Sequence, residues 1–183
     1  MHIQIPALAK TLQLTKESLF VDVGGYIGDF TKHVLLNFDC KVLLFEPYIP
    51  YFEKCQKRFR NDTRVIVLPL GLGNVGSRII YEHKEGTSLF QDWHNIQDEN
   101  KIRFAHIITP RFLDKFDISA LKLNCEGAEY EIIQDIDLNK IPKLLVEFHP
   151  IKNNTYGEVV ELLNRTHAQL KLSTRWELWE RKF

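Results

Sequence analysis

A short glycine-containing segment sets an acidic side chain directly before a tight turn. Asp22, Gly24 and Gly28 form the pattern DxGxxxG, which follows an apolar run at residues 20–23 and leads into a segment with helical periodicity. Glycine allows a positive φ and lets a ligand approach the backbone closely, so a strand, a glycine turn and a helix in this order are typical of sites for nucleotide-like ligands. We therefore expect a ligand site at this turn, shaped by Gly24, Gly25 and Gly28.

The position of the acid distinguishes two kinds of nucleotide ligand. In a dinucleotide site the turn reads GxGxxG and its amides face a pyrophosphate. Here Val23 stands where the first glycine would be, and the carboxylate of Asp22 would repel a pyrophosphate. A carboxylate suits a ligand with a cationic amino acid head, such as S-adenosylmethionine. An NAD(P)-dependent oxidoreductase is the alternative within enzymes, because it shares the strand, the turn and an acid for the ribose.

A second acid follows the next apolar run. Glu46 comes directly after residues 41–45, at the expected interval beyond the glycine turn. A carboxylate at the tip of the second strand can accept hydrogen bonds from both ribose hydroxyls of a nucleoside. The alternative is an acid that is merely solvated at a strand end. Asp22 and Glu46 both lie where a nucleoside-containing cofactor needs an acid, which favours the cofactor site over a merely solvated acid.

Polar residues that could act on an acceptor hydroxyl follow two later apolar runs. Asn124 and Glu126 lie at the end of the run 120–125, and His149 closes the segment IPKLLVEFHP. A hydroxyl that accepts a methyl group must lose a proton, and histidine has the unperturbed pKa best suited to take it near neutrality. We expect His149 to be the base and Glu126 to orient the acceptor. Alternatively, Glu126 caps the following helix and His149 is a solvent-facing residue at a strand end.

Composition limits the classes of protein and partner. With 183 residues, of which 44% are hydrophobic, the chain fits a single domain, residues 1–183. Lys plus Arg and Asp plus Glu number 24 each, so no net charge favours nucleic acid or an anionic membrane as a partner. The three cysteines are unclustered, which argues against disulfides and a zinc site and suits the cytoplasm, and no other ligand spacing demands a metal ion. No apolar run approaches the roughly 18 residues that span a bilayer.

Apolar runs that read as strands alternate with segments of helical periodicity along the chain. This alternation predicts an α/β fold with a mainly parallel sheet, whose ligand site lies beyond the carboxyl ends of the strands. The acids and polar residues described above fall at such ends, as does Gly71. The expected helices include an amphipathic segment at 7–18 and one that Thr155 and Glu158 open as a capping box. The expected strands are residues 20–23, 41–45, 64–70, 78–81, 101–109, 120–125 and 141–150, with two terminal strands in QLKLS and RWELWERKF.

Two segments point to contacts beyond the core. Residues 83–100 are polar and irregular, and a connection of this length is typical of a substrate lid or of a mobile surface loop. The last predicted strand carries Trp176 and Trp179. An exposed aromatic strand at the end of the chain would allow a homodimer.

Seven short motifs resemble, in their order and spacing, the motif set of FkbM-type methyltransferases. They are VDVGGYIGDFT, LLFEP, LGLGN, GTSLF, FLD, LKLNCEGAEYEII and LLVEFHP, between about Phe20 and Pro150, and the tetrad EGAE is the most specific. The resemblance implies a Rossmann-like class I methyltransferase fold, with a mainly parallel seven-stranded sheet, helices on both faces and an antiparallel C-terminal strand. It also implies S-adenosylmethionine-dependent O-methylation of a hydroxyl on a sugar or another small metabolite. On these motifs, the residues expected to line the cofactor are Asp22, Gly24, Gly25, Tyr26, Gly28, Glu46, Pro47, Gly71 and Leu72.

The chain departs from the family pattern at two places. Asn124 stands where the family favours Asp, and Gly25 with Tyr26 replaces a small residue followed by Asn. An amide cannot accept a proton near neutrality, so a general-base role at position 124 is in doubt, although hydrogen bonding remains open to it. A catalytically silent protein that binds S-adenosylmethionine or acts as a scaffold is therefore a second alternative.

Overall fold

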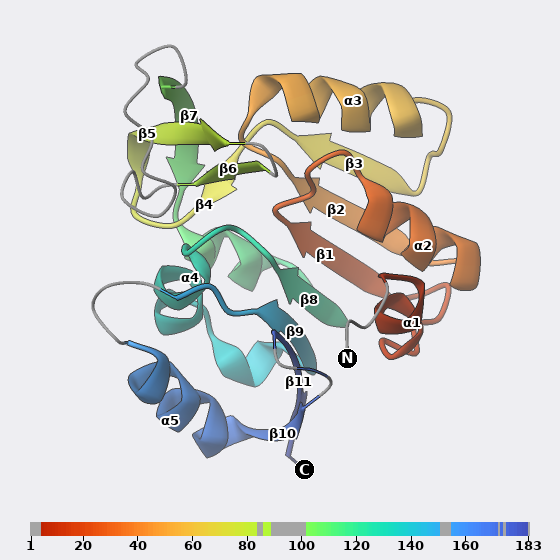
Figure 1. The fold of residues 1–183 in the computed structure, drawn as a ribbon. Coiled ribbons are helices and arrows are strands. Elements are labelled where there is room, and N and C mark those ends of the chain that lie inside the picture. Colours follow the sequence, from red (N-terminus) through yellow and green to blue (C-terminus); the bar gives the residue numbers. More distant parts are fainter. Residues whose placement is uncertain are drawn as a thin grey trace.

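The computed structural model describes residues 5–83, 86–88, 102–150, 155–171, 173 and 175–182. A seven-stranded sheet with the order β10-β11-β9-β8-β1-β2-β3 forms its centre (Figure 1). Neighbouring strands from β9 to β3 run parallel, and β11 is antiparallel to both β9 and β10. The strands are β1 (Leu19–Val23), β2 (Lys41–Phe45), β3 (Val65–Leu68), β8 (Ala120–Leu123), β9 (Lys143–Glu147), β10 (His167–Lys171) and β11 (Trp176–Arg181). The expected fold class is thereby confirmed.

Helices cover both faces of this sheet and bury two separate apolar cores. In β1, Phe20 packs with side chains of the N-terminal helices, whereas Val21 and Val23 pack with side chains of the C-terminal ones. This division follows from the pleat of a strand, which points successive side chains to opposite faces. One face carries α1 (Ile5–Lys10), α2 (Asp29–Asn37) and α3 (Ile49–Phe59), and the other carries α4 (Glu129–Asp135), α5 (Tyr156–Thr166) and the short 3₁₀ helices η3 (Pro110–Lys115) and η4 (Leu138–Lys140).

The strand order reverses at β1, which lies between β2 and β8. Because β1, β2, β8 and β9 are parallel, their carboxyl ends lie along one edge of the sheet. Ligands of open α/β sheets bind outside this edge, at the point where the order reverses. The turns that follow these strands therefore carry the candidate site.

A second, four-stranded sheet lies next to that edge (Figure 1). Its order is β4-β7-β5-β6, and its strands are β4 (Gly71–Leu72), β5 (Gly76–His83), β6 (Gly86–Ser88) and β7 (Ile102–Ile108). The strands expected at 78–81 and 101–109 are confirmed as β5 and β7, which pair antiparallel. The lid predicted at 83–100 falls mostly on residues 84–85 and 89–100, which lie outside the described residues.

One predicted helix boundary and one predicted helix cap are wrong. The leading helix ends at Lys10, not at residue 18, because the chain tightens into a turn there and Gln13 adopts a positive φ of 51°. The capping box at the start of α5 does not form. Thr155 already has helical φ and ψ, and its hydroxyl is buried without a hydrogen-bond partner among the described residues.

The last strand of the chain lies inside the sheet and not at its edge. β11 pairs with β9 on one side and with β10 on the other, and Trp179 is fully buried. The exposed aromatic strand on which the homodimer prediction rests is therefore not present. Among the described helices, none is long and apolar enough to cross a bilayer.

Candidate active site at the carboxyl ends of the parallel strands

The glycine turn after β1 is packed so tightly that side chains are excluded from it. Gly24 has a φ of 79°, and a Cβ there would lie 1.9 Å from the carbonyl oxygen of Asn124. A Cβ on Gly28, whose φ is 82°, would lie 2.7 Å from the ring of Phe59. The N–H groups of Gly24 and Gly25 both donate to the carbonyl oxygen of Phe45, at 3.0 and 3.1 Å. The turn is thus fixed against β2 on one side and against the end of β8 on the other.

Glu46 is buried beside this turn, so its interpretation as a solvated acid is wrong. Its carboxylate accepts hydrogen bonds from the backbone N–H of Tyr26 at 2.7 Å and of Tyr48 at 2.9 Å. Burial raises the pKa of Glu46 to about 7, because the stabilising effect of the two N–H groups only partly offsets the loss of water. Each oxygen keeps a lone pair for a further donor.

Asp22 is completely buried and its carboxylate is bound inside the protein. One oxygen accepts a hydrogen bond from the hydroxyl of Thr31 at 2.7 Å, and the other accepts one from the ammonium of Lys122 at 2.8 Å. Lys122 lies opposite Asp22 in the pairing of β1 with β8, and it also donates to the carbonyl oxygens of Val23 at 3.3 Å and Gly24 at 2.7 Å. The Asp22–Lys122 ion pair therefore stabilises the conformation of the glycine turn.

Tyr26 begins a row of aromatic rings at the outer end of the turn. Its side chain is 39% exposed, and its ring meets the ring of Tyr51 edge-on at 4.5 Å between centroids. Tyr51 in turn meets Tyr48, which packs into the small apolar core beneath β5 and β7. Tyr26 is thus the most exposed ring of this row.

The other predicted cofactor residues lie farther from the turn. A Cβ on Gly71 would lie 2.5 Å from Ile107 and 3.4 Å from Pro47, so Gly71 and Pro47 are neighbours. Leu72 is buried in the core on the α4 and α5 face. Its side chain therefore contributes to packing.

The turn after β8 is built around the buried carboxylate of Glu129. One of its oxygens accepts a hydrogen bond from the N–H of Cys125 at 2.8 Å, and the other accepts one from the N–H of Gly127 at 2.9 Å. Glu126, between them, has a positive φ of 53°, and its side chain remains 24% exposed. In the described turn, the carboxylate that binds backbone N–H groups is thus Glu129, the second acid of EGAE. It is not Glu126, the residue that the alternative interpretation names as the cap.

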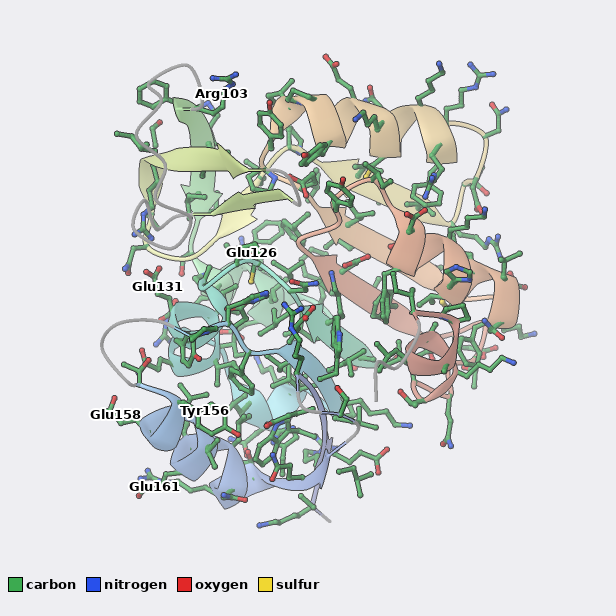
Figure 2. The ribbon with its side chains drawn as sticks, viewed as in Figure 1. Arg103, Glu126, Glu131, Tyr156, Glu158 and Glu161 are labelled. Carbon is green, nitrogen blue, oxygen red and sulfur yellow. The ribbon has the colours of Figure 1, made fainter. Side chains whose placement is uncertain are left out.

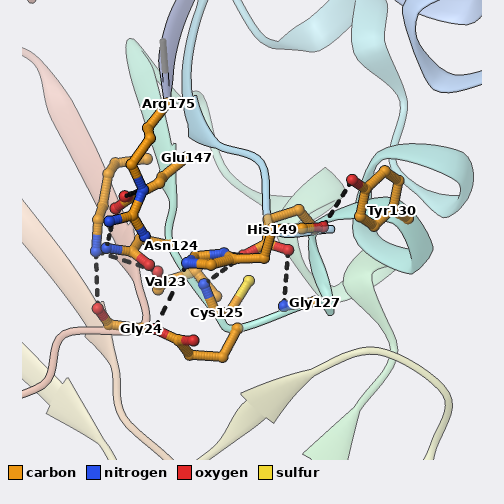
Figure 3. Close-up of polar contacts among 12 residues, drawn as sticks. Val23, Gly24, Asn124, Cys125, Gly127, Tyr130, Glu147, His149 and Arg175 are labelled. Carbon is orange, nitrogen blue, oxygen red and sulfur yellow. Dashed lines mark hydrogen bonds and ion pairs between the residues drawn. The ribbon is translucent and has the colours of Figure 1, made fainter. Parts of the chain in front are cut away.

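His149 is buried between two of these carboxylates, so its interpretation as a solvent-facing histidine is wrong (Figure 3). Its Nδ1 lies 2.9 Å from Glu129 Oε1, and its Nε2 lies 3.6 Å from Glu126 Oε1. Burial alone lowers the pKa of His149, but the hydrogen bond and charge of Glu129, together with Glu126 and Glu147, outweigh it and raise the pKa overall. Burial raises the pKa of Glu126, against the opposing effect of His149.

Asn124 joins a second polar chain at the same edge. Its Nδ2 donates to Glu147 Oε2 at 2.9 Å, and Glu147 Oε1 pairs with Nε of Arg175 at 2.8 Å. Its Oδ1 is buried and has no hydrogen-bond partner among the described residues. The backbone N–H of Asn124 donates to the carbonyl oxygen of Val23 at 3.1 Å, which fixes Asn124 beside the glycine turn.

The small sheet is tied to this part of the site through α4. Nη1 of Arg78 on β5 contacts both carboxylate oxygens of Glu131, at 3.0 and 3.1 Å, and the N–H of Asn74 donates to the same side chain at 3.1 Å. Figure 2 shows Glu131 on α4, and Glu126 where α4 and the small sheet approach each other. Glu126 thus lies beside the small sheet, with its side chain partly exposed.

The structure places His149, Glu126 and Asn124 at one edge of the sheet, and it adds residues that the sequence analysis missed. Lys122 could have been found as a lone charge in an apolar strand, which needs a buried partner. Glu129 lies in the EGAE motif, but its contact with His149 was not predicted, and Arg175 gave no local signal. In the part of the chain that the structure describes, no group of three His, Cys, Asp or Glu side chains is arranged to hold a metal ion.

Comparison with known proteins places this arrangement in a family. The Methyltransferase FkbM domain matches residues 22–170. No curated protein matches the chain in sequence. Methyltransferase FkbM from Methylobacillus flagellatus KT is 14% identical with a TM-score of 0.59, over 92% of this chain and 44% of that one. The chain thus spans less than half the length of that protein.

Two further solved structures share the fold over the whole chain. An rRNA methylase from Streptococcus thermophilus is 14% identical with a TM-score of 0.56, over 100% of this chain and 99% of that one. TrmK from M. capricolum, in complex with S-adenosyl-homocysteine, is 10% identical with a TM-score of 0.52, over 100% of this chain and 69% of that one. At these identities the similarity shows the fold, whereas the family follows from the domain match: the chain belongs to the FkbM methyltransferases.

Proposed function

We propose that this chain binds S-adenosylmethionine and methylates a hydroxyl group of a sugar or another small metabolite. One observation carries the proposal. At one edge of the sheet, a glycine turn flanked by Glu46 lies near a buried histidine that is held between two carboxylates. The first feature suits a nucleoside and the second suits the removal of a proton. The domain match and the complex of a structural neighbour with S-adenosyl-homocysteine support the choice of cofactor.

The residues present fit this cofactor. Gly24 packs against the backbone of Asn124, which fixes the glycine turn beside Glu46. The two oxygens of Glu46 keep lone pairs for the two ribose hydroxyls, in addition to the two N–H groups that they already bind. When bound, the cofactor supplies a methyl group activated by its sulfonium. We assign the cofactor site to Asp22, Gly24, Gly25, Tyr26, Gly28, Glu46, Pro47, Gly71 and Leu72, with Asp22 and Leu72 acting through the shape of the turn and of the core.

His149 and Glu126 share the handling of the acceptor's proton in this proposal. Glu126 is the more exposed of the two, so it contacts and orients the hydroxyl. Nδ1 of His149 lies 2.9 Å from Glu129 and its Nε2 lies 3.6 Å from Glu126, so the two carboxylates stabilise the imidazolium that forms when His149 takes up the proton. Asn124 contributes hydrogen bonding only, because its amide cannot accept a proton.

The proposal extends to partners and compartment. The equal numbers of acidic and basic residues favour a small uncharged acceptor over nucleic acid, although one structural neighbour is named as an rRNA methylase. We propose a cytoplasmic protein that works without a metal ion. Homodimerisation stays a prediction.

Calorimetric titration with S-adenosylhomocysteine, NAD and NADP tests the proposal. We expect S-adenosylhomocysteine to bind and the two nicotinamide nucleotides not to bind. Binding of a nicotinamide nucleotide alone would replace the methyltransferase with the oxidoreductase alternative. Binding of S-adenosylhomocysteine without methyl transfer to any member of a panel of sugars and small alcohols would favour the catalytically silent alternative.

A further inference from the structure

We propose that Asn124, and not Asp22, receives the ammonium group of the methyl donor's amino acid tail, while Asp22 and Lys122 only shape the turn. This inference rests on the proposed function and names the part of the site that recognises the tail. It reverses the expectation drawn from the DxGxxxG pattern, in which the carboxylate of Asp22 meets the ammonium directly.

Asp22 has no surface left for a ligand. Its side chain is completely buried, and each carboxylate oxygen already accepts a short hydrogen bond, from Thr31 or from Lys122. The ammonium of Lys122 also cancels the negative charge at a distance of 2.8 Å. The pair therefore offers little attraction to a second cation.

The hydrogen bonds of Lys122 indicate that the Asp22–Lys122 pair has a structural role. The three N–H groups of Lys122 are matched by three acceptors, namely Asp22 and the carbonyl oxygens of Val23 and Gly24. Two of these acceptors belong to the backbone that forms the glycine turn. The pair thus sets the shape of the turn on which any part of the cofactor would rest.

Asn124 offers what Asp22 lacks. Its Nδ2 is fixed on Glu147, which is itself held by Arg175, so the amide is oriented and its Oδ1 is left as the acceptor. That oxygen has no partner among the described residues, and a buried polar atom without a partner is rare in folded proteins. The residue as a whole is only partly buried. An ammonium group would satisfy the oxygen, and the carboxylate of Glu147 next to it adds attraction.

The order of the strands places this acceptor on the correct side of the turn. Glu46 follows β2, the glycine turn follows β1 and Asn124 follows β8, and these three strands are neighbours in that order. A ligand whose ribose is held by Glu46 therefore extends across the turn toward Asn124. The backbone carbonyl oxygen of Asn124 lies 1.9 Å from the position of a Cβ on Gly24, so the backbone of Asn124 borders the turn directly.

Two ligands that differ only in the tail test the assignment. S-adenosylhomocysteine carries the amino acid tail, whereas methylthioadenosine has the same base and sugar without it. In calorimetric titrations, Asn124→Ala should weaken S-adenosylhomocysteine binding about 10-fold or more, as for a lost hydrogen bond to a charged group, and change methylthioadenosine binding less than about 2-fold. Asn124→Asp keeps an acceptor oxygen for the ammonium but sets a carboxylate against Glu147, so it should retain the preference for S-adenosylhomocysteine over methylthioadenosine that Asn124→Ala loses.

Asp22→Asn provides the opposite arm of the test. It should weaken both ligands by a similar factor, because it disturbs the turn and touches no part of the tail. If this variant is too unstable to titrate, the double variant Asp22→Asn with Lys122→Met removes both charges and carries the same expectation.

Three results would overturn the assignment. The first is an unchanged affinity ratio in Asn124→Ala, and the second is a loss confined to S-adenosylhomocysteine when Asp22 is replaced. In either case the cofactor site itself stands, because the wild-type chain still binds both ligands. The third is a wild-type chain that binds neither ligand, which removes the proposed function together with this inference.

Discussion

At the ends of β1 and β2, the polar side chains are bound by backbone groups and by one buried lysine, whereas at the ends of β8 and β9 they bind mostly each other. Glu46 holds two backbone N–H groups, and Lys122 holds two backbone carbonyls. On the other side, His149 lies between two carboxylates and Asn124 binds a third. We call the first region, the glycine turn with Glu46 and Lys122, the cradle. We call the second region, His149 and Asn124 with the carboxylates that they contact, the side-chain network, and the protonation states of its acids and its histidine depend on one another.

The largest predicted effect breaks the cradle. Lys122→Met leaves the carboxylate of Asp22 buried without its partner, so we expect the free energy of unfolding to fall by about 3–5 kcal/mol. Urea unfolding monitored by circular dichroism measures this loss. Adding Asp22→Asn to the same variant removes the stranded charge and should recover part of the stability. A loss below about 1 kcal/mol in Lys122→Met would mean that the ion pair does not hold the turn.

The second prediction concerns the turn itself. Gly24→Ala forces a Cβ against the carbonyl oxygen of Asn124 in a backbone with a φ of 79°, so we expect a loss of about 2–4 kcal/mol and no measurable cofactor binding. Gly157→Ala is the matched control, because a Cβ on this exposed residue of α5 meets no atom within 4 Å. The control should be neutral or slightly stabilising in the same unfolding assay. Equal effects of the two substitutions would contradict the tight packing of the turn.

A smaller effect with a distinct pH dependence is expected in the side-chain network. Glu129→Gln replaces one carboxylate oxygen, which accepts a hydrogen bond from a backbone N–H, with an NH2 group that cannot accept one. We therefore expect the free energy of unfolding to fall by about 1–3 kcal/mol. Because Glu129 raises the folded pKa of His149 above its unfolded value, protonated His149 contributes stability that is complete at low pH and is lost as the pH rises through the folded pKa. The variant should therefore lose more stability at about pH 5 than at about pH 8.

Nuclear magnetic resonance titration of the His149 imidazole measures the cause of that dependence directly. Its pKa should fall in Glu129→Gln and stay at the wild-type value in Glu158→Gln, which changes an exposed acid on α5. An unchanged pKa in Glu129→Gln would show that the contact with Nδ1 does not control this histidine.

The smallest effect is expected at the rim of the network. Arg175 is 57% exposed, so its ion pair with Glu147 is screened by water. We expect Arg175→Ala to change the unfolding free energy by less than about 1 kcal/mol. A loss above about 2 kcal/mol in urea unfolding would show that the network depends on its exposed end as much as on its buried centre.

Part of the cradle could be predicted from sequence because its glycines and Glu46 lie in local patterns, whereas Lys122 reaches the turn from β8. Gly24 and Gly28 show in one short pattern, and Glu46 follows directly on an apolar run. The network could not be predicted to the same depth. His149 and Glu129 meet only because β8 and β9 are neighbours, and the EGAE motif marks Glu129 without showing which side chain it contacts.

Two errors in the fold have the same origin. The capping box at Thr155 matches the local pattern, but the helical backbone of that residue prevents the cap. The terminal strand around Trp179 reads as an exposed edge from its position in the chain, whereas the pairing of β10 beyond it buries the ring. Local patterns thus predicted the elements, while the contacts between distant elements decided their surroundings.

A crystal structure of the chain with S-adenosylhomocysteine tests the central claim most directly. The account predicts the ribose hydroxyls on Glu46, the sulfur above the glycine turn and the ammonium group on Oδ1 of Asn124. Density for the ligand elsewhere, or a turn at Gly24 that stays empty at saturating ligand, would contradict it.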